Sequence, residues 1–508
     1  MFFDPTPLNG YFQFIDIILL QTRLVESLIF YHASPPMLNL FTGVGVKIFG
    51  HHYLLFFSFA YHLMGALLAM SFMLLVRHLT ANRILALIAT AFLVFSPALV
   101  LYQNWLMYTF PTVTLITFSV YALLKVTRTS SYVWLHIFFA TLGLLVMTRS
   151  LFHLGWFAVV IAIALWLLPA LRSKVIIACI APLIICTLWY GKNQLLFDNF
   201  GSSTWLGLGL SNITTLTVSK DDLQPHVDSG RLSTLALSSR KEKEETIFTT
   251  ESTPTGIAVL DHSSTSLGVN NFNYALMPSF NKVLIKDAST IIRLFPFDYL
   301  SAVIDSNKLF FSTNSASPFF RTEAKQAFHG IRTAYDLFFY GAGWSSNKVS
   351  VPLFGEYRDF RLVSNFGYTT FFLWIISIAY ALIFFFRGYR QRNRDKDYIV
   401  IGYIAFVMLY IQGLSTTVEY SENYRYRFLA EPISWVLITV MIANCVQGAI
   451  RNPRNAEPWA ILKPRKAQPM DGPQARVQDR YHSVNAVVAN CGWLLVSMIH
   501  LWSKKFLR

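Results

Sequence analysis

YLLFFSFAYHLMGALLAMSFMLLV, residues 53–76, contains no lysine, arginine, aspartate or glutamate. A helix crosses the hydrocarbon core of a bilayer with about 20 predominantly apolar residues, so this stretch is long enough to span a membrane. Comparable stretches recur along the chain, and we predict spans at 53–76, 84–101, 110–126, 132–148, 152–171, 174–190, 368–386, 398–413 and 433–450. A weaker stretch at 484–502 is either a terminal span or an amphipathic surface helix.

The composition of the 508 residues agrees with a membrane protein. Hydrophobic residues make up 54% of the chain and charged residues only 14%, whereas a soluble domain carries about a quarter. The net charge is +15, but the cations cluster beside the spans, so they are topology signals and we predict no nucleic-acid partner. The four cysteines show neither metal-type nor disulfide spacing. The predicted fold class is an all-α polytopic membrane protein.

Lysine and arginine alternate between rich and poor connections. Arg77 and Arg83 flank the first connection, YQNWLMYTF (102–110) has no cation, and RGYRQRNRDKD (387–397) has five. Basic connections lie on the cytoplasmic side by the positive-inside rule. We therefore predict that the long segment 191–367 lies outside the cytoplasm, and that the membrane is the plasma, or inner, membrane.

This topology divides the chain into consecutive parts. They are an extracytoplasmic first loop with interfacial helices (1–52), a six-span bundle (53–190), an extracytoplasmic loop or subdomain (191–367), C-terminal spans (368–450) and a basic cytoplasmic tail with a possible terminal helix (451–508). Because the first span runs from outside to inside, either residues 11–30 insert partly or a further span precedes Met1. We expect the second.

The outer segments carry several recognisable patterns. Residues 11–30 and 37–50 are typical of amphipathic helices in the membrane interface. YHASPPMLN (31–39) lies between them, and its two prolines predict a corner that presents polar side chains at headgroup level. Residues 213–267 are polar and predict a flexible loop. Residues 268–345 predict a mostly helical subdomain, with two helices broken at Pro296.

Charged side chains gather at the outer ends of the predicted spans. Arg149 and Lys192 could be ordinary interfacial cations, and His153 could be a structural histidine. Arg425 and Arg427 are harder to explain in that way, because two outer arginines depart from the positive-inside rule. The planar fork of arginine suits phosphate oxygens, so this pair predicts a site for an anionic headgroup.

Several carboxylates lie on the same side and are candidates for a general base. They are Asp4, Asp16, Glu26, Asp198, Glu422 and Glu431. An outer cavity with arginines and a carboxylate suits transfer from a lipid-linked phosphate. The cations would take up the charge of the leaving phosphate, and the carboxylate would deprotonate an incoming hydroxyl.

Four motifs, taken in order, resemble those of the GT-C superfamily of membrane glycosyltransferases. The chain is most similar to the branch that contains protein O-mannosyltransferases and aminoarabinose transferases. The motifs are Asp4 with the later YHASPPMLN, TRSLFH (148–153), KNQLLFDNFGSSTWLGLGL (192–210) and ENYRYRFLAEP (422–432). The resemblance covers about residues 1–450. Two features depart from it, because the chain lacks a first cytoplasmic-to-outer span and Asp4 is followed by proline rather than by an acid.

The resemblance implies a GT-C-like helical bundle and a first-loop aspartate, Asp4, as general base of an inverting transfer. It also implies a set of substrate-binding residues around it: His32, Asn39, Arg149, His153, Lys192, Glu422, Arg425 and Arg427. Some relatives use a divalent metal, so Mg²⁺ or Mn²⁺ is possible, with His32 and Asp4 as the residues that could support it.

The sequence therefore predicts a glycosyltransferase that takes a sugar from a polyprenyl-phosphate donor. The acceptor is a lipid, a glycan or a protein, and the reaction takes place at the outer face among membrane lipids. Two alternatives stay open. One is a transporter or flippase of lipid-linked glycans. The other is an O-antigen-type ligase or polymerase that uses a diphosphate-linked glycan.

Overall fold

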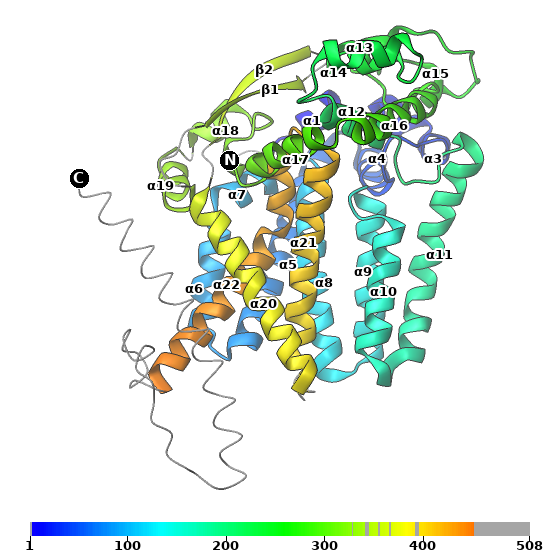
Figure 1. The fold of residues 1–508 in the computed structure, drawn as a ribbon. Helices are drawn as coiled ribbons and strands as arrows, with labels where there is room; N and C mark the ends of the chain where they lie inside the picture. Colours follow the sequence, from blue (N-terminus) through cyan, green and yellow to red (C-terminus); the bar gives the residue numbers. More distant parts are fainter. Residues whose placement is uncertain are drawn as a thin grey trace.

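The computed structural model of the chain describes residues 3–327, 329–340, 345–353, 356–364, 367–391 and 396–451. The apolar stretch 484–502 and nearly all of the predicted basic tail lie outside these residues. The described chain forms a bundle of long helices, covered at one end by shorter helices and a two-stranded hairpin (Figure 1).

The bundle contains a helix at every predicted span from 53 to 450. Its helices are α5 (Tyr53–Thr80), α6 (Arg83–Val94), α7 (Pro97–Gln103), α8 (Thr109–Thr129), α9 (Tyr132–Thr148), α10 (Leu154–Leu167), α11 (Arg172–Phe197), α20 (Tyr368–Gln391), α21 (Asp397–Val418) and α22 (Asn423–Arg451). Within the described residues, six helical segments are long and apolar enough to cross a membrane, or seven if the bent pair α6 and α7 counts as one. The all-α polytopic prediction is thereby confirmed for the bundle.

The predicted span 84–101 is broken. Helix α6 ends at Val94, helix α7 begins at Pro97, and their axes differ by 62°. A proline cannot donate to the preceding turn, but it is well tolerated in the first turn of a new helix. The break therefore sits where the sequence places Ser96 and Pro97.

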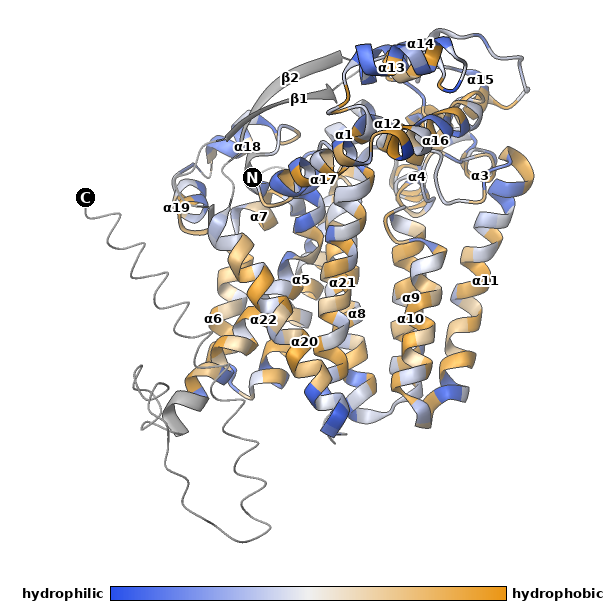
Figure 2. Ribbon diagram, viewed as in Figure 1, coloured by the Kyte–Doolittle hydropathy of each residue, from blue (hydrophilic) through white to orange (hydrophobic). Residues whose placement is uncertain are grey.

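Hydropathy separates the bundle from its cover. Figure 2 shows hydrophobic colours along the bundle helices, hydrophilic colours at several helix ends, and mixed hydrophilic and hydrophobic colours over the covering helices. The covering elements before α20 are α1 (Thr6–Gly10), α2 (Ile17–Thr22), α3 (Leu24–Ile29), α4 (Met37–Phe49), α12 (Leu206–Thr214), α13 (Lys220–Asp228), α14 (Arg240–Thr249), α15 (Ala258–Asp261), α16 (Met277–Leu294), α17 (Pro296–Phe310), α18 (Thr322–Ala327), α19 (His329–Tyr340), β1 (Ser345–Leu353) and β2 (Glu356–Ser364). Strands β1 and β2 pair antiparallel, from Ser345 opposite Ser364 to Leu353 opposite Glu356.

The expectation of a flexible loop over residues 213–267 is wrong. This segment contains α13, α14 and α15, and α14 begins with a capping box in which Ser239 and Glu242 bond each other's backbone. The Ser-x-x-Glu pattern that stabilises this helix start is present in the sequence. By contrast, the predicted break at Pro296 is confirmed, because α16 ends at Leu294 and α17 begins at Pro296.

The first loop is fixed to the bundle by buried polar contacts. The Asn39 side chain accepts a hydrogen bond from the Ile15 backbone N–H (2.8 Å) and donates to the Gln13 carbonyl (2.9 Å). The backbone of Asp4 pairs with that of Trp105 in an isolated bridge. These contacts hold the residues that precede α2 over the end of the bundle.

Candidate functional site

The bundle ends in a pocket of about 620 Å³ that combines three arginines with two glutamates, and we call it the arginine pocket. Its walls come from distant parts of the chain, and they are Phe12, Gln13, Ala33, Ser34, Pro35, Tyr108, Thr148, Arg149, Ser150, Ser203, Trp205, Arg240, Phe272, Glu419, Glu422, Arg425 and Tyr426. The prolyl corner and the two span-end segments that carry Arg149 and Arg425 thus meet in one place.

Arg149 is the least satisfied charged residue of the pocket. It follows the last residue of α9 in an extended conformation, and only 3% of its surface is exposed. Its guanidinium lies between the rings of Tyr108 (4.8 Å) and Tyr426 (4.4 Å). Neither Nη1 nor Nη2 has a hydrogen-bond partner. A buried guanidinium with unpaired donors carries a desolvation penalty, which a bound anion would relieve.

Arg425 provides a second cation of the pocket, in the first turn of α22. Its Nη2 contacts the Glu422 carboxylate at 2.7 Å and donates to the Tyr108 hydroxyl at 3.0 Å. Its Nε has no partner. Tyr108 therefore contacts both arginines, with its ring against Arg149 and its hydroxyl toward Arg425.

Arg240 is a pocket residue that the sequence analysis missed, because its segment was expected to be a flexible loop. It is the first residue of α14 and pairs with Glu244 at 3.1 Å. Its guanidinium lies 5.5 Å from the Trp205 ring centroid. The signal that could have found it was the capping box directly around it, since an ordered helix start fixes the direction of its first side chains.

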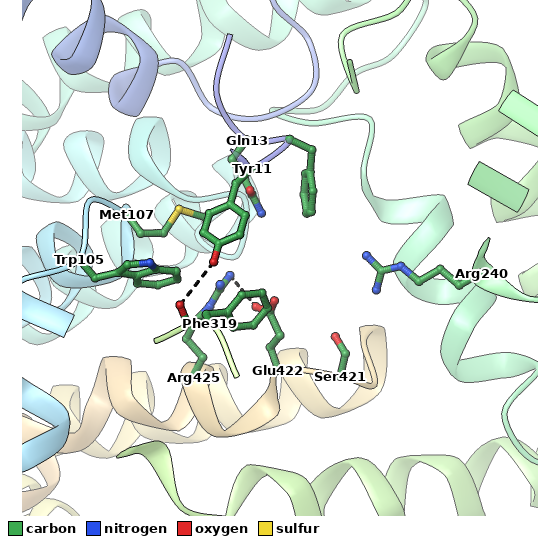
Figure 3. Close-up of a pocket in the computed structure, with 10 residues that line it drawn as sticks. Tyr11, Gln13, Trp105, Met107, Arg240, Phe319, Ser421, Glu422 and Arg425 are labelled. Carbon is green, nitrogen blue, oxygen red and sulfur yellow. Dashed lines mark hydrogen bonds and ion pairs between the residues drawn. The ribbon is translucent and has the colours of Figure 1, made fainter. Parts of the chain in front are cut away.

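A smaller pocket adjoins the arginine pocket and shares five residues with it. Figure 3 shows the lining side chains, with Trp105, Met107 and Tyr11 on one side and Arg240 reaching in from the other. Phe319 closes this adjoining pocket, and its carbonyl accepts a hydrogen bond from the Tyr11 hydroxyl (3.5 Å). The Arg425–Glu422 ion pair forms part of the wall that both pockets share.

Of the six carboxylates that the sequence offered as bases, only Glu422 lines the arginine pocket. Burial raises the pKa of the Glu422 carboxyl, against the lowering effect of the Arg425 charge. The other candidates have structural partners: Asp16 caps α2, Glu26 pairs with Arg23, Asp198 with Lys282 and Glu431 with Arg427. A second pocket carboxylate, Glu419, accepts from the Tyr426 hydroxyl at 2.5 Å.

Asp4 lies outside both pockets. Its carboxylate accepts hydrogen bonds from the Thr6 backbone N–H (3.1 Å) and the Thr6 hydroxyl. The Nε of Arg321 approaches the same oxygen at 3.6 Å. Asp4 lies next to the adjoining pocket, because it forms a backbone bridge with Trp105 and because burial and the charge of Asp4 together raise the pKa of Tyr11, and both of these residues line that pocket.

Arg427 does not join Arg425. Its guanidinium donates to the carbonyls of Phe310 (2.9 Å) and Ser312 (3.2 Å), and it lies 3.5 Å from the Glu431 carboxylate. It lines a different pocket, between α19, α20 and α22. The sequence predicted that the two arginines act together at one site. The structure instead places Arg425 and Arg427 in different pockets. Arg427 joins the end of α17 to α22.

The remaining predicted residues surround the site without lining it. His32 is fully buried, its Nδ1 lies 3.0 Å from the Thr204 hydroxyl, and burial lowers its pKa to about 3. Lys192 donates to the Tyr31 carbonyl at 2.5 Å and lies over the Trp189 ring. Asn39 fixes the first loop as described above. His153 precedes α10, is exposed, and lines neither pocket.

A divalent metal finds no ready ligand set in the part of the chain that the structure describes. No three histidine, cysteine, aspartate or glutamate side chains converge there. The pair that could have supported a metal is divided between different partners, because Asp4 is bound by Thr6 and the His32 ring faces Thr204 and Phe197. The residues present therefore do not fit the possible Mg²⁺ or Mn²⁺, and no step is assigned to it.

No protein-family model matches the chain, and no curated protein matches it. A search of solved structures matched the crystal structure of ArnT from Cupriavidus metallidurans bound to undecaprenyl phosphate. The two share 13% sequence identity over 90% of this chain and 82% of that chain, with a TM-score of 0.27. A likeness this distant carries no argument about the reaction or its residues.

Proposed function

We propose that this chain is a multi-pass membrane glycosyltransferase that moves a sugar from a polyprenyl-phosphate donor to a hydroxyl acceptor. The observation that carries the proposal is Arg149. Its guanidinium is buried, stacked between two tyrosine rings, and has two nitrogens without partners in a pocket at the end of a membrane bundle. A lipid phosphate would satisfy these donors, while its tail could stay in the bilayer.

The pocket suits the leaving group of such a transfer. Arg149 and Arg425 approach it from two different helix ends, and both are almost completely removed from water. Fixed cations in a water-poor site stabilise developing charge without reorganisation. As the bond between the anomeric carbon and the phosphate oxygen breaks, the negative charge left on the phosphate would be taken up by these arginines.

Glu422 is the base that the geometry favours. Its carboxylate lies on the wall common to both pockets, so it can face a phosphate in one and a sugar or acceptor hydroxyl in the other. A carboxyl whose pKa is raised by burial is a better proton acceptor near neutral pH than an ordinary one. The acceptor oxygen would bond to the anomeric carbon while its proton passes to Glu422.

The resemblance assigns the same role to Asp4, and the two assignments are separable. We propose to measure turnover as the release of free polyprenyl phosphate, in membrane vesicles of the producing organism that contain its own lipid-linked donors. Glu422→Gln should lose at least about a hundredfold in rate, since a general base contributes roughly 10²–10⁴-fold. Asp4→Asn should retain most of the rate.

The opposite result, with Asp4→Asn inactive and Glu422→Gln active, would return the base to Asp4. Loss in neither variant would contradict acid–base transfer at this site. Release of polyprenyl diphosphate instead of polyprenyl phosphate would favour the ligase or polymerase alternative. Net movement of an unchanged lipid-linked glycan would favour the flippase.

The membrane side is part of the proposal. We propose the plasma membrane and its outer face, because the ends of α5, α8 and α20 opposite the arginine pocket carry basic residues such as Arg77, Arg128 and Arg390. Positive residues favour the cytoplasmic side. The division of the chain into first loop, six-span bundle, outer subdomain and C-terminal spans is proposed on the same ground.

A further inference from the structure

A second cavity lies within the bundle and has the opposite character to the arginine pocket. It is an open groove with about 960 Å³ of space between α10 on one side and α20 and α21 on the other. No charged residue lines it, and its walls include Ala164, Leu382, Phe385 and Phe406. We call it the apolar groove. The bundle helices around it carry hydrophobic colours in Figure 2.

One end of the groove carries cations. Trp166, near the end of α10, packs against Tyr389 near the end of α20, with 5.1 Å between ring centroids. Arg172 donates from Nε to the Leu165 carbonyl (3.0 Å), which places its guanidinium at the end of α10 beside Trp166. Arg387 directly follows Phe386, which lines the groove, and Arg390 lies one turn further along α20.

Among the residues that the structure describes, none of Arg172, Arg387 and Arg390 forms an ion pair with a carboxylate. The nearby acid Asp397 is already bound by Arg128 at 2.6 Å. Arginines that flank an apolar groove, beside a tryptophan and a tyrosine of the interface, have the charge and placement that an anionic lipid headgroup requires.

We propose that the apolar groove binds a diacyl anionic phospholipid from the leaflet on the basic side of the membrane. An acyl chain would fill the groove between α10 and α20, and the phosphate would lie among Arg172, Arg387 and Arg390. The lipid would fill the space between α10 and α20, beside the contact between Trp166 and Tyr389.

This site is separate from the arginine pocket. The two cavities share no lining residue. Between them lies an aromatic cluster in which the Tyr410 hydroxyl donates to the Leu151 carbonyl (2.6 Å) and its ring packs against Trp156. A lipid in the groove therefore does not contact Arg149.

The test compares phospholipids added to the purified full chain. We would measure the melting temperature and, by native mass spectrometry, the bound lipid, in micelles supplemented with phosphatidylglycerol or with phosphatidylcholine. Phosphatidylglycerol should raise the melting temperature more. Each cation near an anionic headgroup contributes roughly fivefold in affinity, so the triple variant Arg172→Gln/Arg387→Gln/Arg390→Gln should bind about a hundredfold more weakly.

A second variant tests the groove itself without changing charge. Ala164→Phe should reduce the bound phosphatidylglycerol by filling the groove, and Leu382→Trp on the opposite wall serves if the first variant does not fold. The matched control is Arg77→Gln, a basic-side cation at the end of α5, which should leave binding unchanged.

Equal shifts with the two lipids would overturn the proposal. So would phosphatidylglycerol binding that survives both the triple variant and the groove variant. Displacement of phosphatidylglycerol by undecaprenyl phosphate in an Arg149→Met background would also overturn it, because the groove would then hold the donor lipid.

Discussion

Two buried arginines at the same end of the bundle should respond in opposite ways to the same change. Arg149→Met and Arg427→Met each remove one guanidinium and keep an unbranched side chain of similar length. Arg149 and Arg427 are 3% and 2% exposed, so burial alone does not distinguish them. They differ in their hydrogen-bond and ion-pair partners.

Removing Arg427 leaves the buried Glu431 carboxylate with the Asn314 amide as donor but without its cation, and it leaves two carbonyls without the donor that satisfies them. Breaking a buried pair in this way costs about 3–5 kcal/mol. Removing Arg149 loses two tyrosine contacts of roughly 1 kcal/mol each but also removes two unpaired donors, which cost about 1–3 kcal/mol. The stability change at Arg149 should therefore lie within about 1 kcal/mol of zero.

Ligand binding should show the reverse order. Two charge-assisted hydrogen bonds from Arg149 to a phosphate contribute at least about 3 kcal/mol, or roughly a hundredfold in Kd. We expect undecaprenyl phosphate to raise the melting temperature of the unaltered chain and of any folded Arg427 variant, but not of Arg149→Met. The assay is thermal unfolding in detergent with and without undecaprenyl phosphate.

The reasoning would be refuted if Arg149→Met destabilised the chain as much as Arg427→Met. Its guanidinium would then serve packing rather than a ligand. An undiminished shift with undecaprenyl phosphate in Arg149→Met would equally exclude it from the phosphate site. Arg149→Lys provides a control that keeps the charge but not the planar fork, and it should restore only part of the binding.

Three further predictions concern the supports of the site. Burial raises the pKa of Asp336 to about 6, so the folded chain holds a proton that the unfolded chain has released. Stability should therefore fall as the pH rises from about 4 to 6. Asp336→Asn should remove this slope of melting temperature against pH, and an unchanged slope would contradict the prediction. Asn39→Ala leaves the Ile15 N–H and the Gln13 carbonyl unpaired, so it should lower the free energy of unfolding by about 2–3 kcal/mol. A loss below about 0.5 kcal/mol would show that water replaces the side chain. Ser239→Ala removes the N-terminal cap of α14 and should lower the stability of this helix by about 1 kcal/mol. The measurement is amide hydrogen exchange, which should become faster only in α14. Exchange that stays slow there would mean that packing alone fixes Arg240.

The positions of the spans could be read from the sequence. Apolar length and the distribution of cations act locally, since a segment either can or cannot bury itself in a bilayer. Helix α5 begins at Tyr53, where its apolar stretch begins, and α17 begins at the predicted Pro296. Arg149 and Arg425, which line one pocket, could also be picked out from the sequence as charged residues at the ends of predicted spans.

One error could have been avoided from the sequence. Arg425 and Arg427 were expected to act together, but α22 already begins at Asn423. Two residues apart on a helix are separated by about 200° around its axis, so the two guanidinium groups must point to different sides. The predicted span began only at residue 433, so the prediction did not treat the preceding residues as helical, whereas α22 continues through Pro432.

The chain alone determined which segments enter the membrane and which polar groups remain at its surface, because hydrophobicity and charge are properties of short segments. Only the tertiary structure decided that Arg149, Arg240 and Arg425 share a pocket while Asp4 and Arg427 do not. These side chains lie far apart in sequence, and their meeting depends on how the bundle helices pack and on where the covering helices lie against them. A site assembled from such distant parts becomes visible only when the helices are in place.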